Sequence, residues 1–163
     1  MRYAFWKSGK SMKKAIRLLF FLYCVWMLWL LFGQRFGSHD GQSYAQVLEQ
    51  NLNLVPFRTV RRYTYVLRYL SDPVMIRQAV VNLAGNICLF IPLGFFLPCS
   101  AKKLRKFFPL LGFSFCLILT VEILQFVTFL GCCDVDDLIL NIAGILLGFC
   151  LWKLAERHLT EKL

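Results

Sequence analysis

The sequence predicts an all-α membrane protein: a four-transmembrane-helix bundle with both termini in the cytoplasm and an outer loop that carries an interfacial helix. The first observation is that apolar residues, 58% of the 163, gather in four blocks, each long enough to cross a bilayer as a helix. The second is that basic residues gather in short clusters beside these blocks. A water-soluble protein would need four wholly buried helices and would have almost no polar surface to cover them.

The four apolar blocks define the spans of a single domain, residues 1–163. Their bounds are Ile16–Phe32, Ala79–Leu97, Phe107–Leu130 and Leu138–Leu154. The first block exceeds the roughly 7–15 apolar residues of a signal peptide, and no small-residue cleavage site follows it, so we expect an uncleaved anchor. Residues 33–78, between the first two spans, form the predicted outer loop.

The net charge of +10 is concentrated at two places that set the orientation. Basic residues without any acid precede or enter the first span, and others fill the link between the second and third spans: Arg2, Lys7, Lys10, Lys13, Lys14 and Arg17, then Lys102, Lys103, Arg105 and Lys106. Such clusters flank spans on the cytoplasmic side and interact with anionic headgroups. We therefore expect a topology signal and no nucleic-acid partner.

The outer loop contains one amphipathic segment, Arg58–Leu70. Val60, Tyr63, Leu67 and Leu70 recur at helical spacing beneath arginines, as in helices that lie in the headgroup region. Four arginines, which would lie outside against the usual bias, are predicted to face lipid phosphates or an anionic ligand: Arg58, Arg61, Arg62 and Arg68. The alternative is a solvated loop.

Polar residues inside the second and third spans indicate a buried site. Asn82 and Asn86 are four residues apart on one helical face, and Glu122 and Gln125 are three apart near the outer end of their span. An ionisable group at membrane depth costs about 2.5–3.5 kcal/mol on insertion scales, which makes Glu122 the candidate catalytic residue. The alternative is structural, because amides hydrogen-bond between helices and a buried glutamate can be protonated.

The last segment carries a polar stripe that continues into small residues. Asp134, Asp137 and Asn141 are followed by Gly144 and Gly148 at a 3-4-3-4 spacing, which places all five on one helical face. The glycines permit close approach of another helix. The stripe therefore faces a neighbouring span, with its polar half at the outer end.

Matched depth in the bilayer predicts that the polar groups share one outward-facing pocket. Its predicted lining is Asn82, Asn86, Glu122, Gln125, Asp134, Asp136, Asp137 and Asn141. Carboxylates and amides suit a divalent cation, a cationic headgroup or acid–base chemistry. A divalent cation is the one cofactor that these groups suggest, with Asp134, Asp136 and Asp137 as candidate ligands. Capping of a helix N-terminus would explain one aspartate, Asp136 for example, but not three.

Four motifs follow one another along the chain: NLVPF at Asn53–Phe57, NLAGNICLFIPLGFFLP at Asn82–Pro98, EILQ at Glu122–Gln125 and DVDDLILNIAGILLG at Asp134–Gly148. Together they resemble the VanZ-like family of small bacterial membrane proteins. The resemblance implies functional positions at Asn53, Pro56, Asn82, Asn86, Pro92, Glu122, Gln125, Asp134, Asp136, Asp137 and Asn141. It also implies a multi-pass protein of a plasma membrane, mostly in Gram-positive bacteria. The family's namesake is linked to low-level resistance to the glycopeptide teicoplanin.

Two functions from different classes fit these predictions. In the first, the pocket binds an amphiphilic envelope ligand, such as a membrane lipid, a lipid-linked envelope component or an acylated glycopeptide antibiotic. In the second, an intramembrane metal-dependent hydrolase or transferase acts on a lipid headgroup, with Glu122 as acid or base. No His lies near the predicted pocket, and no Ser or Cys nucleophile is placed with a base, so metal-activated water is the enzymatic route. A transporter is disfavoured because four spans offer little room.

Overall fold

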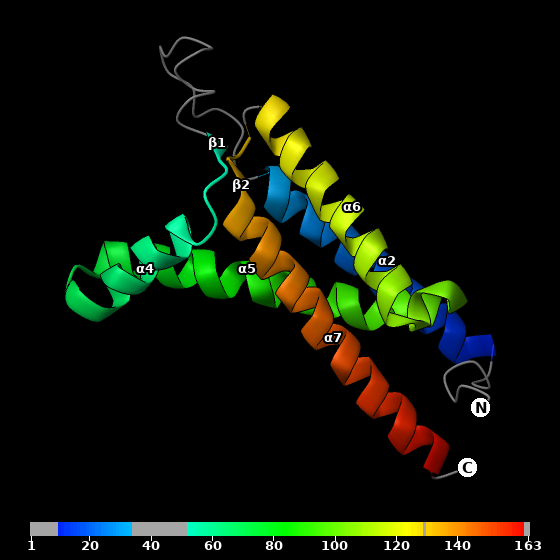
Figure 1. The fold of residues 1–163 in the computed structure, drawn as a ribbon. Coiled ribbons are helices and arrows are strands. Elements are labelled where there is room, and N and C mark those ends of the chain that lie inside the picture. Colours follow the sequence, from blue (N-terminus) through cyan, green and yellow to red (C-terminus); the bar gives the residue numbers. More distant parts are fainter. Residues whose placement is uncertain (1–9, 34–51, 129, 162–163) are drawn as a thin grey trace.

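The computed structural model describes residues 10–33, 52–128 and 130–161, and this part of the chain is mainly helical (Figure 1). Its elements are α2 (Lys10–Phe32), β1 (Leu52–Asn53), α4 (Arg58–Tyr69), α5 (Pro73–Ser100), the 3₁₀ segment η2 (Lys102–Arg105), α6 (Phe107–Val127), β2 (Cys133–Asp134) and α7 (Val135–Glu161). The basic residues Arg2 and Lys7 and residues 34–51 of the predicted outer loop lie outside the described residues.

Among the described residues, four helices are long and apolar enough to cross a membrane, which confirms the predicted all-α fold with four spans. The spans are Lys14–Phe32 in α2, Pro73–Ser100, Phe107–Val127 and Val135–His158 in α7. The amphipathic segment of the outer loop is helical as predicted, and forms α4.

The second span begins earlier than predicted because a cap extends the helix. The carboxylate of Asp72 accepts the N–H of Val74 at 2.8 Å, which satisfies one of the donors that a helix leaves open at its start. Pro73 occupies the first turn, where its missing N–H is not needed.

The third span ends earlier than predicted because the chain turns sharply after Val127. The carbonyl oxygen of Gln125 accepts the N–H groups of Leu130 (2.9 Å) and Gly131 (3.2 Å). This turn directs the chain into β2 and brings the first residues of α7, which begins at Val135, beside the end of α6.

The centre of the bundle is the crossing of α5 and α7, the most extensive helix pair (Figure 1). A Cβ atom at Gly144 would overlap the carbonyl oxygen of Ile87, and one at Gly148 would overlap that of Ile91. Only glycine lets the two backbones approach this closely. The predicted role of the two glycines as a helix-contact surface agrees with this geometry.

Buried apolar side chains around the α5–α7 contact form the hydrophobic core. Helix α2 packs against this core along one side only. Phe90, Ile118, Ile145 and Phe149 are all buried. The hydroxyl of Tyr23 in α2 donates to the carbonyl oxygen of Leu89 at 2.6 Å. Many large apolar side chains elsewhere on the spans are exposed, as expected for helices that face lipid.

The two ends of the bundle differ in composition. Figure 1 shows the start of α2, the end of α7 and the η2 link toward one end, with the two strands and the C-terminal ends of α2 and α6 at the other. Lys103 and Lys106 of the basic link are exposed, whereas Arg105 is 6% exposed and donates from Nε to the carbonyl oxygen of Pro98 at 3.0 Å. Arg105 therefore also closes the turn between α5 and α6.

We expect the end that carries β2 to lie outside the cell, and cysteine labelling can test this. Cys132 is exposed, whereas burial raises the pKa of the Cys133 thiol, and the nearby carboxylates of Glu122 and Asp134 raise it further. Since thiolates are the species that react, Cys132 is the better probe.

With Cys132 as the sole cysteine, an impermeant maleimide should label the protein in intact cells. A Lys103→Cys variant in a cysteine-free background should react only after the cells are permeabilised. External labelling at position 103 would reverse the proposed orientation.

Candidate functional site

Asp136 is buried and joins the start of α7 to the start of α4. Its side chain is 0% exposed. Oδ1 accepts the backbone N–H of Phe57 at 2.5 Å, and Oδ2 accepts those of Thr59 (2.8 Å) and Val60 (3.0 Å). A carboxylate of α7 thus caps the N-terminus of α4, where N–H groups and the helix dipole favour negative charge. Phe57, the residue before α4, has a φ of 63°, which turns these N–H groups toward Asp136.

Asp134 joins the same two segments through side chains. Its Oδ1 accepts from Asn53 Nδ2 (3.0 Å) and from the backbone N–H of Asp136 (2.8 Å), and its Oδ2 accepts from Thr59 Oγ1 at 2.5 Å. β1 and β2 pair in parallel, with Asn53 opposite Asp134. We call Asn53, Phe57, Thr59, Asp134 and Asp136 the clasp, because together they fix α4 to the start of α7.

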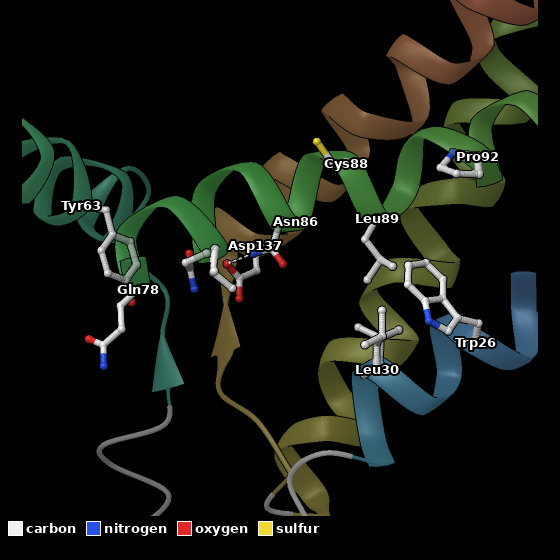
Figure 2. A pocket seen from close by; sticks show the side chains of 13 residues that line it. Trp26, Leu30, Tyr63, Gln78, Asn86, Cys88, Leu89, Pro92 and Asp137 are labelled. Carbon is white, nitrogen blue, oxygen red and sulfur yellow. Dashed lines mark hydrogen bonds between the residues drawn. The ribbon is translucent and has the colours of Figure 1, made fainter. Parts of the chain in front are cut away.

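Asp137 faces the other way, into a cavity of about 760 Å³ between α2, α4, α5 and α7. The lining residues are Trp26, Leu30, Leu31, Tyr63, Gln78, Val81, Asn82, Gly85, Asn86, Cys88, Leu89, Pro92 and Asp137. Figure 2 shows Asn86 of α5 beside Asp137, where Asn86 Nδ2 donates to Asp137 Oδ1 at 2.6 Å. We call this cavity the groove.

The groove is polar toward one end and apolar toward the other. Its α5 wall runs from Gln78 to Pro92, a distance of about 21 Å at 1.5 Å per residue. Gln78 and Asn86 lie toward α4, whereas Leu89 and Pro92 lie on the side of α2 (Figure 2). Trp26 and Leu30 of α2 cover the apolar end.

One hydrogen-bond acceptor at the polar end lacks a partner. The side-chain oxygen of Asn82, which lines the groove, is buried and makes no hydrogen bond to any described residue. A buried polar atom without a partner costs about 1–3 kcal/mol, so a donor from a bound molecule would stabilise the site.

The other predicted pocket residues do not line the groove. Glu122, 3% exposed, accepts the backbone N–H of Asp134 on Oε2 at 3.4 Å, and Gln125 donates from Nε2 to the carbonyl oxygen of Leu31 at 3.0 Å. Asn141 is 3% exposed, and its side-chain oxygen has no partner among the described residues. The structure thus places Glu122 and Gln125 where they tie α6 to β2 and to the end of α2.

Within the described ranges, the candidate ligands Asp134, Asp136 and Asp137 do not converge on one metal position. No group of three His, Cys, Asp or Glu side chains in the described ranges is arranged to hold an ion. Asp134 and Asp136 direct their oxygens to N–H and O–H donors of the clasp, so the predicted ligand set of Asp134, Asp136 and Asp137 is divided between two places.

Of the 13 residues that line the groove, the predicted pocket list contains three, Asn82, Asn86 and Asp137. The ten that it missed include Trp26, Leu30, Tyr63 and Gln78. Gln78 carried a signal, because it lies one helical turn before Asn82 on the same face. The four predicted interfacial arginines are exposed on α4 and do not line the groove: Arg58, Arg61, Arg62 and Arg68.

Comparison with known proteins agrees with the motif-based resemblance. The VanZ/LLP1 family model matches residues 19–156, which include all four motifs. Protein VanZ from Enterococcus faecium is 31% identical over 154 residues, which are 94% of this chain and 81% of that protein. No solved structure shows significant similarity to the chain. The predicted resemblance is confirmed.

Proposed function

This chain belongs to the VanZ/LLP1 family, and we propose that it binds an amphiphilic envelope ligand in the groove. It is a multi-pass membrane protein by its four spans, and we infer that it resides in the plasma membrane of a Gram-positive bacterium. The ligand's polar head would lie between Asn82, Asn86 and Asp137, and its apolar tail would run along α5 toward Pro92.

The polarity gradient along the groove is the observation that supports this function. A site for a wholly polar solute would have polar groups along its length, and a void left by imperfect packing would have none. Here polar side chains line one end and Trp26, Leu30 and Leu89 the other, over a length of about 21 Å that accommodates an extended acyl chain.

The polar end selects for groups that donate hydrogen bonds. Asp137 supplies a carboxylate and Asn82 a side-chain oxygen without a partner in the described chain. Both accept, so hydroxyl, amide N–H and ammonium groups suit them. A lipid-linked sugar or peptide meets this requirement, as does an acylated glycopeptide such as teicoplanin. Resistance to that antibiotic is therefore the phenotype that this proposal predicts.

Gly85→Leu is expected to block the groove without removing any polar group. Gly85 lines the groove, and the nearest atom to a Cβ placed there is Val81 Cγ1 at 4.0 Å, so a larger side chain would extend into the groove. Native mass spectrometry of the purified protein should show loss of a co-purifying amphiphile, and teicoplanin sensitivity of expressing cells should increase. Gly112→Leu on α6 is the matched control, because no atom lies within 4 Å of its Cβ position.

Asp137→Asn should weaken retention of the same amphiphile by about ten-fold or more, since hydrogen bonds to a charged group contribute about 1.5–3 kcal/mol. Unchanged lipid retention and unchanged sensitivity in both variants would refute the binding proposal. Conversion of a labelled lipid by the purified protein would replace binding with catalysis as the function.

A further inference from the structure

A second surface, on α4, is separate from the groove. With about 100° between successive residues, α4 has two faces. Thr59, Tyr63 and Val66 lie on the face that is turned toward the rest of the protein, and Val66 is buried. The opposite face carries six exposed side chains at helical spacing: Arg58, Arg61, Arg62, Tyr65, Arg68 and Tyr69. We call these six the arginine–tyrosine face.

The positive charge of this face is not neutralised by the described chain. None of the four guanidinium groups pairs with a described Asp or Glu, and residues 52–71 contain no acid. Like charges within one or two turns of a helix repel each other. An anionic partner would remove this repulsion.

The two tyrosines of this face are a residue type that is typical of the membrane–water interface. Tyr65 is 59% and Tyr69 is 62% exposed, with their ring centroids 4.9 Å apart. The guanidinium of Arg68 lies over the Tyr69 ring, 5.6 Å from its centroid. Tyrosine rings are enriched at the headgroup level, and arginine can lay its apolar stem along such rings while its charged end reaches phosphate.

The position of α4 places this face at the boundary of the membrane. Only residues 70–72 separate α4 from α5, a helix that is long and apolar enough to span from Pro73 onward. α4 lies beside the first turns of α5 (Figure 1). Exposed apolar residues flank α4 in the sequence: Leu54 and Phe57 before it and Val74 after it.

We propose that the arginine–tyrosine face binds the phosphate groups of anionic membrane lipids and so holds α4 in the headgroup layer. Guanidinium groups donate paired hydrogen bonds to phosphate. The binding is to the lipid surface and does not require an occupied groove.

A photo-crosslinker can test the proposal at the face itself. Tyr65→p-benzoylphenylalanine would report lipids between Arg61 and Arg68, and the same replacement of Phe113, an exposed residue of the α6 span, would report bulk lipid. Both proteins would be irradiated in vesicles of mixed phosphatidylglycerol and phosphatidylcholine. We expect a higher ratio of captured phosphatidylglycerol to phosphatidylcholine at position 65 than at position 113.

Three further variants, each made in the protein with the crosslinker at position 65, test whether the arginines cause the preference for phosphatidylglycerol. Arg61→Gln with Arg68→Gln should lower the ratio by about five-fold per arginine at low salt, whereas Arg61→Lys with Arg68→Lys should retain most of it. Gly85→Leu should leave the ratio unchanged. Equal ratios at positions 65 and 113, or no effect of the glutamine pair, would overturn the proposal. A loss of preference in Gly85→Leu would do so as well, since the captured lipid would then belong to the groove.

Discussion

Replacing Asp136 with alanine is expected to release the start of α4 from α7, at a cost on the order of 3–6 kcal/mol in the free energy of unfolding. The carboxylate is fully buried and accepts the backbone N–H groups of Phe57, Thr59 and Val60. Alanine would leave three donors without an acceptor, each costing about 1–3 kcal/mol where water does not reach it. Asp136→Asn should recover only part of the loss, because one amide oxygen replaces two carboxylate oxygens.

Hydrogen exchange and proteolysis would measure this release. Amide protection at residues 57–60 should fall, and trypsin should cleave after Arg58 and Arg61 faster than in the unmodified protein. Asp72→Ala is the matched control: it also removes a capping aspartate, but one that accepts a single exposed N–H, from Val74, and it should cost about 1 kcal/mol. Unchanged protection at residues 57–60 in Asp136→Ala would show that the clasp does not hold α4.

The spans could be predicted from the sequence because a bilayer imposes a minimum length on every apolar helix that crosses it. The span ends could not be predicted to the residue. The third span ends at Val127 because the Gln125 carbonyl oxygen accepts two N–H groups from the following turn. The second span starts at Pro73 because of the Asp72 cap. Both span ends depend on a few local hydrogen bonds, which the pattern of apolar residues in the sequence does not predict.

The residues of the candidate site also differ in how well the sequence predicts their positions. Depth and helical face suffice to predict that Asn86 and Asp137 lie near each other, because both belong to spans that cross the same layer. Asp136 accepts from Phe57 and Val60, more than 70 residues away in the sequence, and no spacing rule connects these segments. Asp134, Asp136 and Asp137 are near neighbours in the sequence, but Asp137 faces the groove and the other two belong to the clasp, because successive side chains at the start of a helix point in different directions.

The α2 wall at the apolar end of the groove carried no sequence signal. Trp26 and Leu30 look like any other lipid-facing residues of a span, and only the position of α2 beside α5 makes them wall residues. Polar residues in the sequence therefore predict the polar end of the groove but not its apolar end.

Gly148→Ala and Gly144→Ala are expected to separate α5 from α7, each at a cost of about 1–3 kcal/mol. The added methyl group would overlap the carbonyl oxygen of Ile91 at position 148 and that of Ile87 at position 144. Backbone cannot rotate out of the way as a side chain can, so one helix must move. Gly112→Ala, with open space around its Cβ position, should have no comparable effect. Unfolding in detergent mixtures would measure the difference.

The two glycines should differ in their effect on the groove, which separates loss of stability from loss of function. Ile87 follows Asn86, whose amide donates to Asp137 at 2.6 Å, so a shift of α5 at this level separates the two groups that define the polar end. Ile91 lies one turn further on, beside the apolar end. In molecules that remain folded, Gly144→Ala should therefore lose the co-purifying amphiphile, whereas Gly148→Ala should retain most of it. Equal retention in both variants would mean that the Asn86–Asp137 contact does not position the ligand's head.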